Sequence, residues 1–201
     1  YSRFLVSEES ASLRPVHPES DIWRYYGQIA QQPAPADTTK HYSLLDHVRH
    51  LVSDEPNMRA RKLYGGLNLW LGRNAEKLLE AASTARDEKD PDLVHRSLIR
   101  SLDYLDGKAQ STRDLPLGTS FLIDPLAGQV GLLTFDQQQL LPGLLTHVET
   151  HLEGLVNSPG ITPSQRSLGT QLDQATKLVQ KELTQAYQDA KQLVAMPDAQ
   201  L

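Results

Sequence analysis

The sequence predicts an all-α fold in which four long amphipathic helices form a four-helix bundle. Leucine occurs 33 times, against 15 isoleucines and valines together, and this composition favours helix over strand. Apolar residues recur every three or four positions in four stretches, residues 57–87, 91–113, 134–158 and 162–196. The apolar stretch 114–133 lacks this period, so we expect it to cross over between the second and third helices.

The 201 residues have the length of a single structural domain. We expect residues 57–201 to form the bundle and residues 1–56 to form an arm, punctuated by prolines, that packs on it. Two short helices are predicted in the arm, over residues 21–31 and 39–54. The apolar stripe of the second one contains His41, Leu44, Leu45, Val48, Leu51 and Val52, so His47 and His50 are expected to diverge from the buried face.

Local signals mark the first two bundle helices. Gly65, Gly66 and Gly72 interrupt the pattern of residues 57–87, which indicates a kink or the close approach of another helix. Asp90-Pro91-Asp92 combines a capping side chain, a first-turn proline and an acid that suits the helix dipole. This tripeptide therefore predicts the start of the helix over residues 91–113.

The second half of the chain has similar signals. A small hairpin between Phe121 and Thr134 is an alternative structure for the crossover. Thr134 begins a capping-box pattern for residues 134–158, although Pro142 predicts a kink or a later start of that helix. A second capping box at Thr162 opens residues 162–196, whose apolar stripe predicts a face that is buried along its whole length.

Composition excludes several classes of protein. Without cysteine the chain has no disulfide, thiolate metal site or cysteine nucleophile. The net charge of -5 argues against nucleic acid as a partner, and no apolar run is long enough for a transmembrane segment. The absence of cysteine, together with many Gln, Ser, Thr and Pro residues, suits an extracytoplasmic or secreted bacterial domain, and a cytoplasmic location is the alternative. Because the chain begins at Tyr1, a membrane anchor before it stays open.

Histidine spacing gives the only candidate metal ligands. His147 and His151 are four residues apart, which places two imidazoles on one side of a helix, with His151 at the border of the apolar stripe and His147 further toward solvent. No third ligand is evident near them, and His41, His47 and His50 form a weaker local group. We therefore expect no metal and no cofactor, and no catalytic motif identifies an enzyme.

Aromatic residues give the candidate contacts with a partner or ligand. Trp23, Tyr25 and Tyr26 lie on the proline-rich arm, where they could anchor a partner or attach the arm to the bundle. Tyr64 and Trp70 accompany the helix glycines and could line a small pocket or fill the core, and Phe121 lies in the apolar crossover.

These observations predict a non-enzymatic interaction or sensory module with a protein partner. The first alternative is a helical bundle that binds a metal or small ligand through His147 and His151. The second is a cytosolic adaptor whose helix over residues 134–158 binds a partner helix, because no lysine or arginine occurs between Arg113 and Arg166.

Overall fold

The structure, a computed structural model, describes residues 2–9, 23–107, 125–134 and 142–197. The protein is mostly helical, with 63% helix and six α-helices among the described residues, as the composition predicts. In chain order these helices are α1 (Leu44–Val52), α2 (Pro56–Ala60), α3 (Leu67–Asp87), α4 (Pro91–Asp106), α6 (Leu144–Asn157) and α7 (Pro163–Val194). A short 3-10 helix, η2 (Ala127–Gln129), precedes α6, and two strands, β1 (Arg3–Ser7) and β2 (Trp23–Gln28), precede α1. None of the described helices is both long and apolar enough to cross a membrane.

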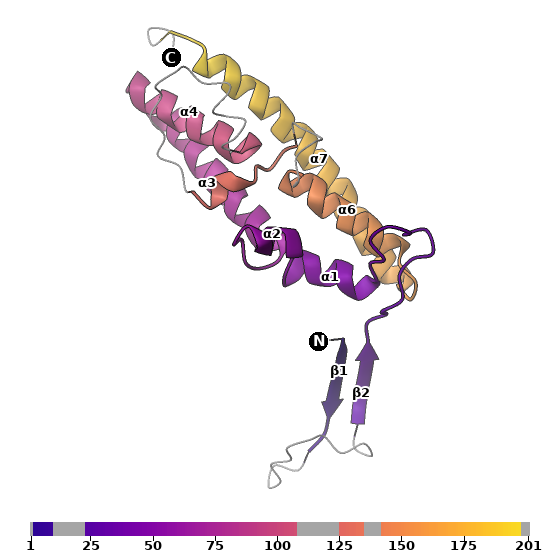
Figure 1. The fold of residues 1–201 in the computed structure, drawn as a ribbon. Coiled ribbons are helices and arrows are strands. Elements are labelled where there is room, and N and C mark those ends of the chain that lie inside the picture. Colours follow the sequence, from indigo (N-terminus) through magenta and orange to yellow (C-terminus); the bar gives the residue numbers. More distant parts are fainter. Residues whose placement is uncertain (1, 10–22, 108–124, 135–141, 198–201) are drawn as a thin grey trace.

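The long helices surround one apolar core. α3 packs against α4 and α6, and α7 packs against the same two helices from the other side (Figure 1). α1 contacts both α3 and α6, so it lies across one end of this group. Leu67, Leu102, Leu105, Leu132 and Leu144 are fully buried where these elements meet. Burial of such leucine side chains stabilises the fold by about 1.5–3 kcal/mol each.

The helix predicted over residues 21–31 is wrong, because this segment contains β2. β2 pairs antiparallel with β1, with Val6 opposite Tyr25 and Leu5 opposite Tyr26. Aromatic side chains favour strands, and the pairing partner lies some twenty residues earlier, where local periodicity cannot reveal it. The β1–β2 pair stands apart from the helices (Figure 1), and the segment that follows it contacts α1, where the Leu45 amide donates to the Ala30 carbonyl at 3.1 Å. A bridge between Pro33 and Ser43, the N-cap residue of α1, is a second contact.

The helix predicted over residues 57–87 is divided in two. α2 ends at Ala60 and α3 begins only at Leu67, with Gly66 as its N-cap residue. Gly65 has a positive φ of 109°, which L side chains rarely adopt. A Cβ on Gly66 would lie 2.4 Å from the carbonyl carbon of Val52, so the end of α1 crosses the chain at Gly66. Gly65 and Gly66 thus lie at a close approach, as the sequence indicated, and α3 begins directly after them. Gly72, inside α3, is at no close approach, because a Cβ there would meet nothing within 4 Å.

The helices α4 and α6 are also shorter than the sequence predicts. α4 ends at Asp106, with Gly107 as its C-cap residue at a φ of 81°, before the expected end at residue 113. α6 begins at Leu144, two residues after Pro142, as the alternative interpretation of that proline predicts. Phe121 lies outside the described residues, as does part of the hairpin that is an alternative prediction between Phe121 and Thr134. Within the described part of that segment, η2 occupies residues 127–129.

The capping boxes of α1 and α7 are both present. Ser43 accepts from the Asp46 amide at the start of α1, and Thr162 accepts from the Gln165 amide at the start of α7. The buried face predicted along all of α7 is wrong, because Leu168 and Leu172 in its first half are exposed. In the second half, Tyr187 and Ala190 join the core, and Leu183 and Val194 pack against it.

Candidate metal centre

Four histidines from two helices form one buried cluster. His47 and His50 come from α1, and His147 and His151 come from α6. The His147 ring stacks on His151 with 5.3 Å between centroids, and the His50 ring meets His151 edge-on at 4.8 Å. Residues three or four apart share one side of a helix, so packing α1 against α6 brings both pairs together.

His47 and His151 are joined across the two helices. Their Nδ1 atoms lie 3.0 Å apart, so one nitrogen carries the proton and the other accepts it. A histidine whose Nδ1 is held in this way has its Nε2 available as a ligand atom. The contact therefore fixes the orientation of the His151 ring.

Glu55 brings a carboxylate into the cluster. Its Oε2 accepts from the Met58 amide at 2.7 Å as the N-cap of α2, and its Oε1 accepts from the Asn57 side chain at 3.0 Å. Oε1 also lies 3.8 Å from Nε2 of His147. Glu55 is only 1% exposed, and no lysine or arginine among the described residues forms an ion pair with it. A buried carboxylate without a counter-charge is costly unless a cation joins it.

The donor atoms have a spacing that suits one metal ion. One ligand atom each from His50, Glu55 and His151 lies within 4.8 Å of the other two. Two ligands that bind one zinc ion at about 2.1 Å can be up to ~4.2 Å apart, so only a small contraction is needed. Nε2 of His147 is a third nitrogen, beside Glu55.

Burial keeps the imidazoles in the neutral form that binds metals. The pKa of His151 is lowered to about 3, first by burial and then by the neighbouring His50 and His147. Burial is also the main reason that the pKa values of His47, His50 and His147 are lowered. Nδ1 of His50 and Nδ1 of His147 are buried and have no hydrogen-bond partner among the described residues. Neutral nitrogens without partners are suited to bind a cation.

Tyr42 and Gly154 shape the surroundings of the cluster. The Tyr42 ring meets His50 edge-on at 4.8 Å and His47 at 5.7 Å. Burial raises the pKa of Tyr42, so the phenol stays neutral. A Cβ on Gly154 would lie 2.1 Å from Cε1 of His47, so the absent side chain is what lets the His47 ring lie against α6.

A pocket of about 380 Å³ opens onto the cluster. Glu55, His147 and His151 form part of its wall, and Lys40 and Asp37 lie on the loop that covers it. This volume lies within the range of about 300–1,000 Å³ that ligand pockets usually have. The candidate ligand atoms can therefore be reached from outside the protein.

A second group of acidic residues is already neutralised. Carboxylate oxygens of Glu149, Glu153 and Asp173 also lie within 4.8 Å of one another. The Lys177 ammonium contacts all three, at 3.3, 3.3 and 2.9 Å, and their hydrogen bonds raise the pKa of Lys177. A lysine thus takes the place that a metal ion would need.

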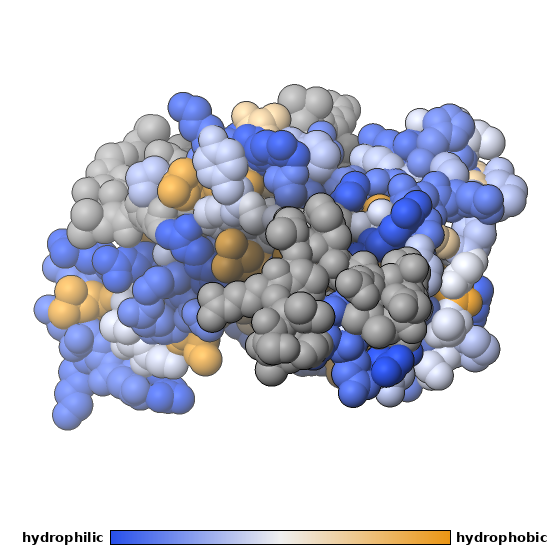
Figure 2. Space-filling view, turned by 90° about the horizontal axis from the view of Figure 1, so that it is seen from below, coloured by the Kyte–Doolittle hydropathy of each residue, from blue (hydrophilic) through white to orange (hydrophobic). Residues whose placement is uncertain are grey.

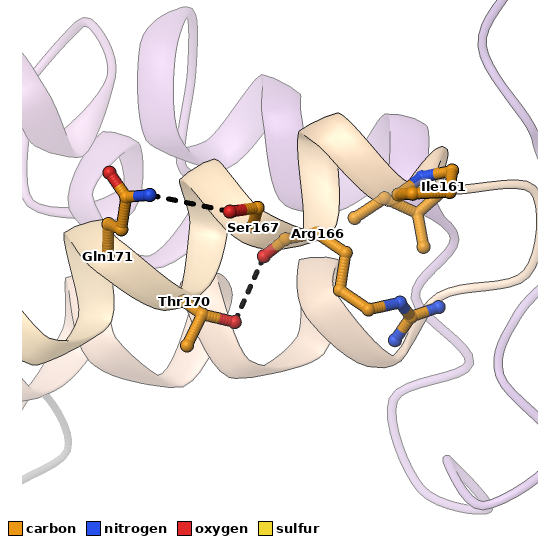
Figure 3. A pocket seen from close by; sticks show the side chains of 6 residues that line it. Ile161, Arg166, Ser167, Thr170 and Gln171 are labelled. Atoms are coloured by element: carbon orange, nitrogen blue, oxygen red, sulfur yellow. Dashed lines mark hydrogen bonds between the residues drawn. The ribbon is translucent and has the colours of Figure 1, made fainter.

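Figure 3 shows another pocket, of about 670 Å³, at the start of α7. Gln171 donates to the Ser167 hydroxyl at 3.3 Å, and Thr170 donates to the Arg166 carbonyl at 2.9 Å. Arg166 itself donates to the carbonyl of Val156. Local hydrogen bonds use these polar groups, and no candidate ligand lines this pocket, so the histidine cluster is the stronger site.

The sequence-based interpretation of the histidines needs correction at three positions. His147 is buried, although its helical angle predicted a place toward solvent, because α1 covers that side of α6. His47 and His50 are buried as well, whereas His41 precedes α1 and is exposed. The buried side of α1 carries Leu44, Leu45, His47 and His50, because α3 and α6 pack against it, whereas Val52 of the predicted stripe is exposed.

The aromatic residues of the arm lie away from the histidine cluster. Tyr25 and Tyr26 are 70% and 51% exposed on β2, so neither fixes the strand pair to the helices. Trp23 begins β2, and its side chain lies outside the described part of the protein. The prediction that these side chains contact a partner stays a prediction.

Of the remaining aromatic candidates, Trp70 lies in the core and Tyr64 lies at the surface. Trp70 is buried in the core, and its Nε1 donates to the Tyr64 carbonyl at 3.0 Å. The Tyr64 side chain is 65% exposed just before α3. Phe121 lies outside the described residues.

Sequence reasoning missed Glu55, Tyr42 and Gly154. The pair Glu55-Pro56 carries a signal, because an acidic N-cap followed by proline marks a helix start and holds the carboxylate in place. Nothing in the sequence shows that the two histidine pairs meet, because 104 residues separate His47 from His151.

Comparisons with protein-family models, with curated proteins and with solved structures found no match to this chain. The functional argument therefore depends on the site itself.

Proposed function

We propose that this protein is a helical metal-binding protein that holds one divalent transition-metal ion between α1 and α6. The observation that carries the proposal is Glu55, a fully buried carboxylate placed among four buried histidines without a lysine or arginine counter-ion in the described residues. A divalent cation supplies the missing positive charge and fills the space between nitrogen atoms that have no other partner.

The donor set favours zinc. Imidazole nitrogens with one carboxylate oxygen, and no thiolate, form the ligand set of many zinc sites, and cobalt(II) and nickel(II) accept the same donors. His50, His151 and Glu55 are the three ligands in this proposal, and His147 lies beside Glu55. A tetrahedral ion then keeps a fourth position for a ligand from solution. The four-helix bundle predicted from the sequence is the scaffold of this proposal: α3, α4, α6 and α7 support the site, and α1 closes it.

The metal content of the whole chain, made without a histidine tag, tests the proposal. After loading with zinc and desalting, elemental analysis should find about one ion per chain. His50→Gln and His151→Gln should each lose most of the metal while the helical circular dichroism signal stays. His41→Gln is the matched control, because His41 is exposed and lies outside the cluster. A metal-free wild-type protein, or a His50→Gln/His151→Gln protein that keeps its zinc, would overturn the proposal.

A second candidate is an interaction or sensory module, favoured by the strand pair that stands apart from the helices and exposes Tyr25 and Tyr26 (Figure 1). The face seen in Figure 2 is largely hydrophilic with scattered hydrophobic residues, so an aromatic anchor is the more plausible contact than a broad apolar surface on that face. Crosslinking in intact cells, with wild type against Tyr25→Ser/Tyr26→Ser, tests this role. Loss of a specific crosslink supports it, and an unchanged crosslinking pattern contradicts it.

The second candidate, an interaction or sensory module, also raises the question of where in the cell the protein lies. The absence of cysteine suits the extracytoplasmic or secreted location expected from the sequence. Digestion of the full-length gene product by protease added to intact cells supports that location. Protection that ends only on lysis supports the cytoplasmic alternative.

A further inference from the structure

The pocket beside the histidine cluster is lined by some residues of the cluster and not by others. Glu55 and His151, two of the proposed ligands, lie in its wall together with His147, so a metal ion held there faces the pocket. His50 does not line it and lies on the inner side of the cluster. A metal ion that faces a pocket can keep a coordination position for a ligand from solution, as catalytic and transport sites do.

Asp37 organises the loop that covers the pocket. Its carboxylate accepts from the amides of Lys40 at 2.9 Å and Tyr42 at 2.8 Å, and from the Thr39 amide at 3.2 Å. These hydrogen bonds lower the pKa of Asp37 to about 2. The Asp37 charge is thus directed at the loop backbone, and the loop holds Lys40 at the pocket.

Lys40 is the one lysine or arginine among the described residues that line this pocket. No ion pair of Lys40 occurs within the described part of the chain, whereas Glu153, which also lines the pocket, is paired with Lys177. Lys40 lines the same pocket as Glu55, His147 and His151, so its positive charge is available to an anion bound in that pocket.

We propose that the pocket binds a small carboxylate anion, with one oxygen on the metal ion and its negative charge facing the Lys40 ammonium. This inference rests on the proposed metal site. A bound divalent ion and Glu55 leave one positive charge, and Lys40 adds a second, unpaired one. Asp37 and Glu153 in the same walls disfavour anions of higher charge, so a monocarboxylate fits better than phosphate.

The test uses the full-length chain loaded with cobalt(II), because the visible absorption of cobalt(II) depends on the ligands of the metal. Titration with acetate should change this spectrum in a saturable way. Lys40→Gln should bind cobalt as the wild type does, and its dissociation constant for acetate should rise about tenfold, the effect of losing one charge-assisted contact. Lys181→Gln is the control, because Lys181 is exposed on α7 and does not line the pocket.

The outcomes separate this inference from the proposed function. A chain that takes up one cobalt ion but shows no spectral change with acetate overturns the carboxylate site and leaves the metal site standing. Equal acetate binding by wild type and Lys40→Gln overturns the role of Lys40. Saturation by inorganic phosphate at lower concentration than acetate overturns the preference for a monocarboxylate. A chain that takes up no cobalt overturns both proposals.

Discussion

Nδ1 of His47 on α1 lies 3.0 Å from Nδ1 of His151 on α6, although 104 residues separate them in the chain. Only one of the two rings can donate at this contact, so the pair fits two neutral imidazoles. The contact joins α1, which carries the proposed ligand His50, to α6, which carries the proposed ligand His151. Helix packing and metal binding are therefore expected to depend on each other.

The first prediction concerns His47 as the residue that orients His151. His47→Phe removes the hydrogen bond and keeps a buried ring, so zinc affinity should fall about 10–100-fold, the usual effect of losing an outer partner of a ligand. His47→Gln, which can still hydrogen-bond, should lose less. Zinc titration against a competing chromophoric chelator measures both. Unchanged affinity in a folded His47→Phe protein would contradict the orienting role, and complete loss of zinc would make His47 a direct ligand.

The second prediction concerns Gly154. A methyl group here would lie 2.1 Å from Cε1 of His47, so Gly154→Ala must displace the ring or separate α1 from α6. We expect a loss of about 1–3 kcal/mol in the free energy of unfolding, as overpacking usually costs. Gly72→Ala is the control, because a Cβ at Gly72 in α3 meets nothing within 4 Å. Alanine should stabilise that position by up to ~1 kcal/mol.

Urea unfolding of both variants measures the difference. A Gly154→Ala protein as stable as Gly72→Ala would show that the His47 ring does not lie against α6.

The third prediction concerns pH in the metal-free protein. All four cluster histidines have pKa values lowered below 6.5, so the unfolded chain binds protons that the folded protein does not. Stability is therefore full above pH 6.5 and falls as the pH drops below it, toward the folded pKa of about 3 for His151. Each such histidine adds at most about 1.4 kcal/mol per pH unit to this fall.

Urea unfolding at pH 7, 6 and 5 with a chelator present checks this dependence. His151→Gln should flatten the profile relative to the wild type, and His41→Gln should leave it as it is. Stability that is constant from pH 7 to pH 5 would contradict the burial of neutral histidines.

The fourth prediction concerns the segment between α4 and α6. The Asn74 side chain on α3 donates to the Val130 carbonyl at 2.9 Å, and this contact is buried. Asn74→Leu leaves that carbonyl without its donor, so the free energy of unfolding should fall by about 1–3 kcal/mol. Asn68→Leu, at an exposed position of the same helix, should change stability by less than about 0.5 kcal/mol. Thermal unfolding compares the two, and equal melting temperatures would contradict the docking of this segment on α3.

Much of the helical structure follows from local signals. The Thr162 and Gln165 capping box, and Pro91 after Asp90, mark helix starts that the structure contains. These signals are reliable because they act within one turn of the chain. Gly65 and Gly66 were interpreted as interruptions of one helix, whereas the backbone of α1 crosses at Gly66 and ends the pattern there.

The site depends on tertiary contacts that the sequence does not display. The spacing of His147 and His151 could be found in advance, but their partners on α1 could not, because the apolar residues of that helix predicted a different buried side from the one that packs on α6. Glu55 acts as a ligand candidate only because the N-cap of α2 points its carboxylate into the space between α1 and α6. The pairing of β1 with β2 is likewise nonlocal.

The most direct test of the account is anomalous diffraction from crystals of the zinc-loaded chain, measured above and below the zinc absorption edge. The account predicts one strong anomalous peak between α1 and α6, about 2.0–2.2 Å from ligand atoms of His50, His151 and Glu55. A peak at any other place in the protein, or none in crystals grown with zinc, would contradict it.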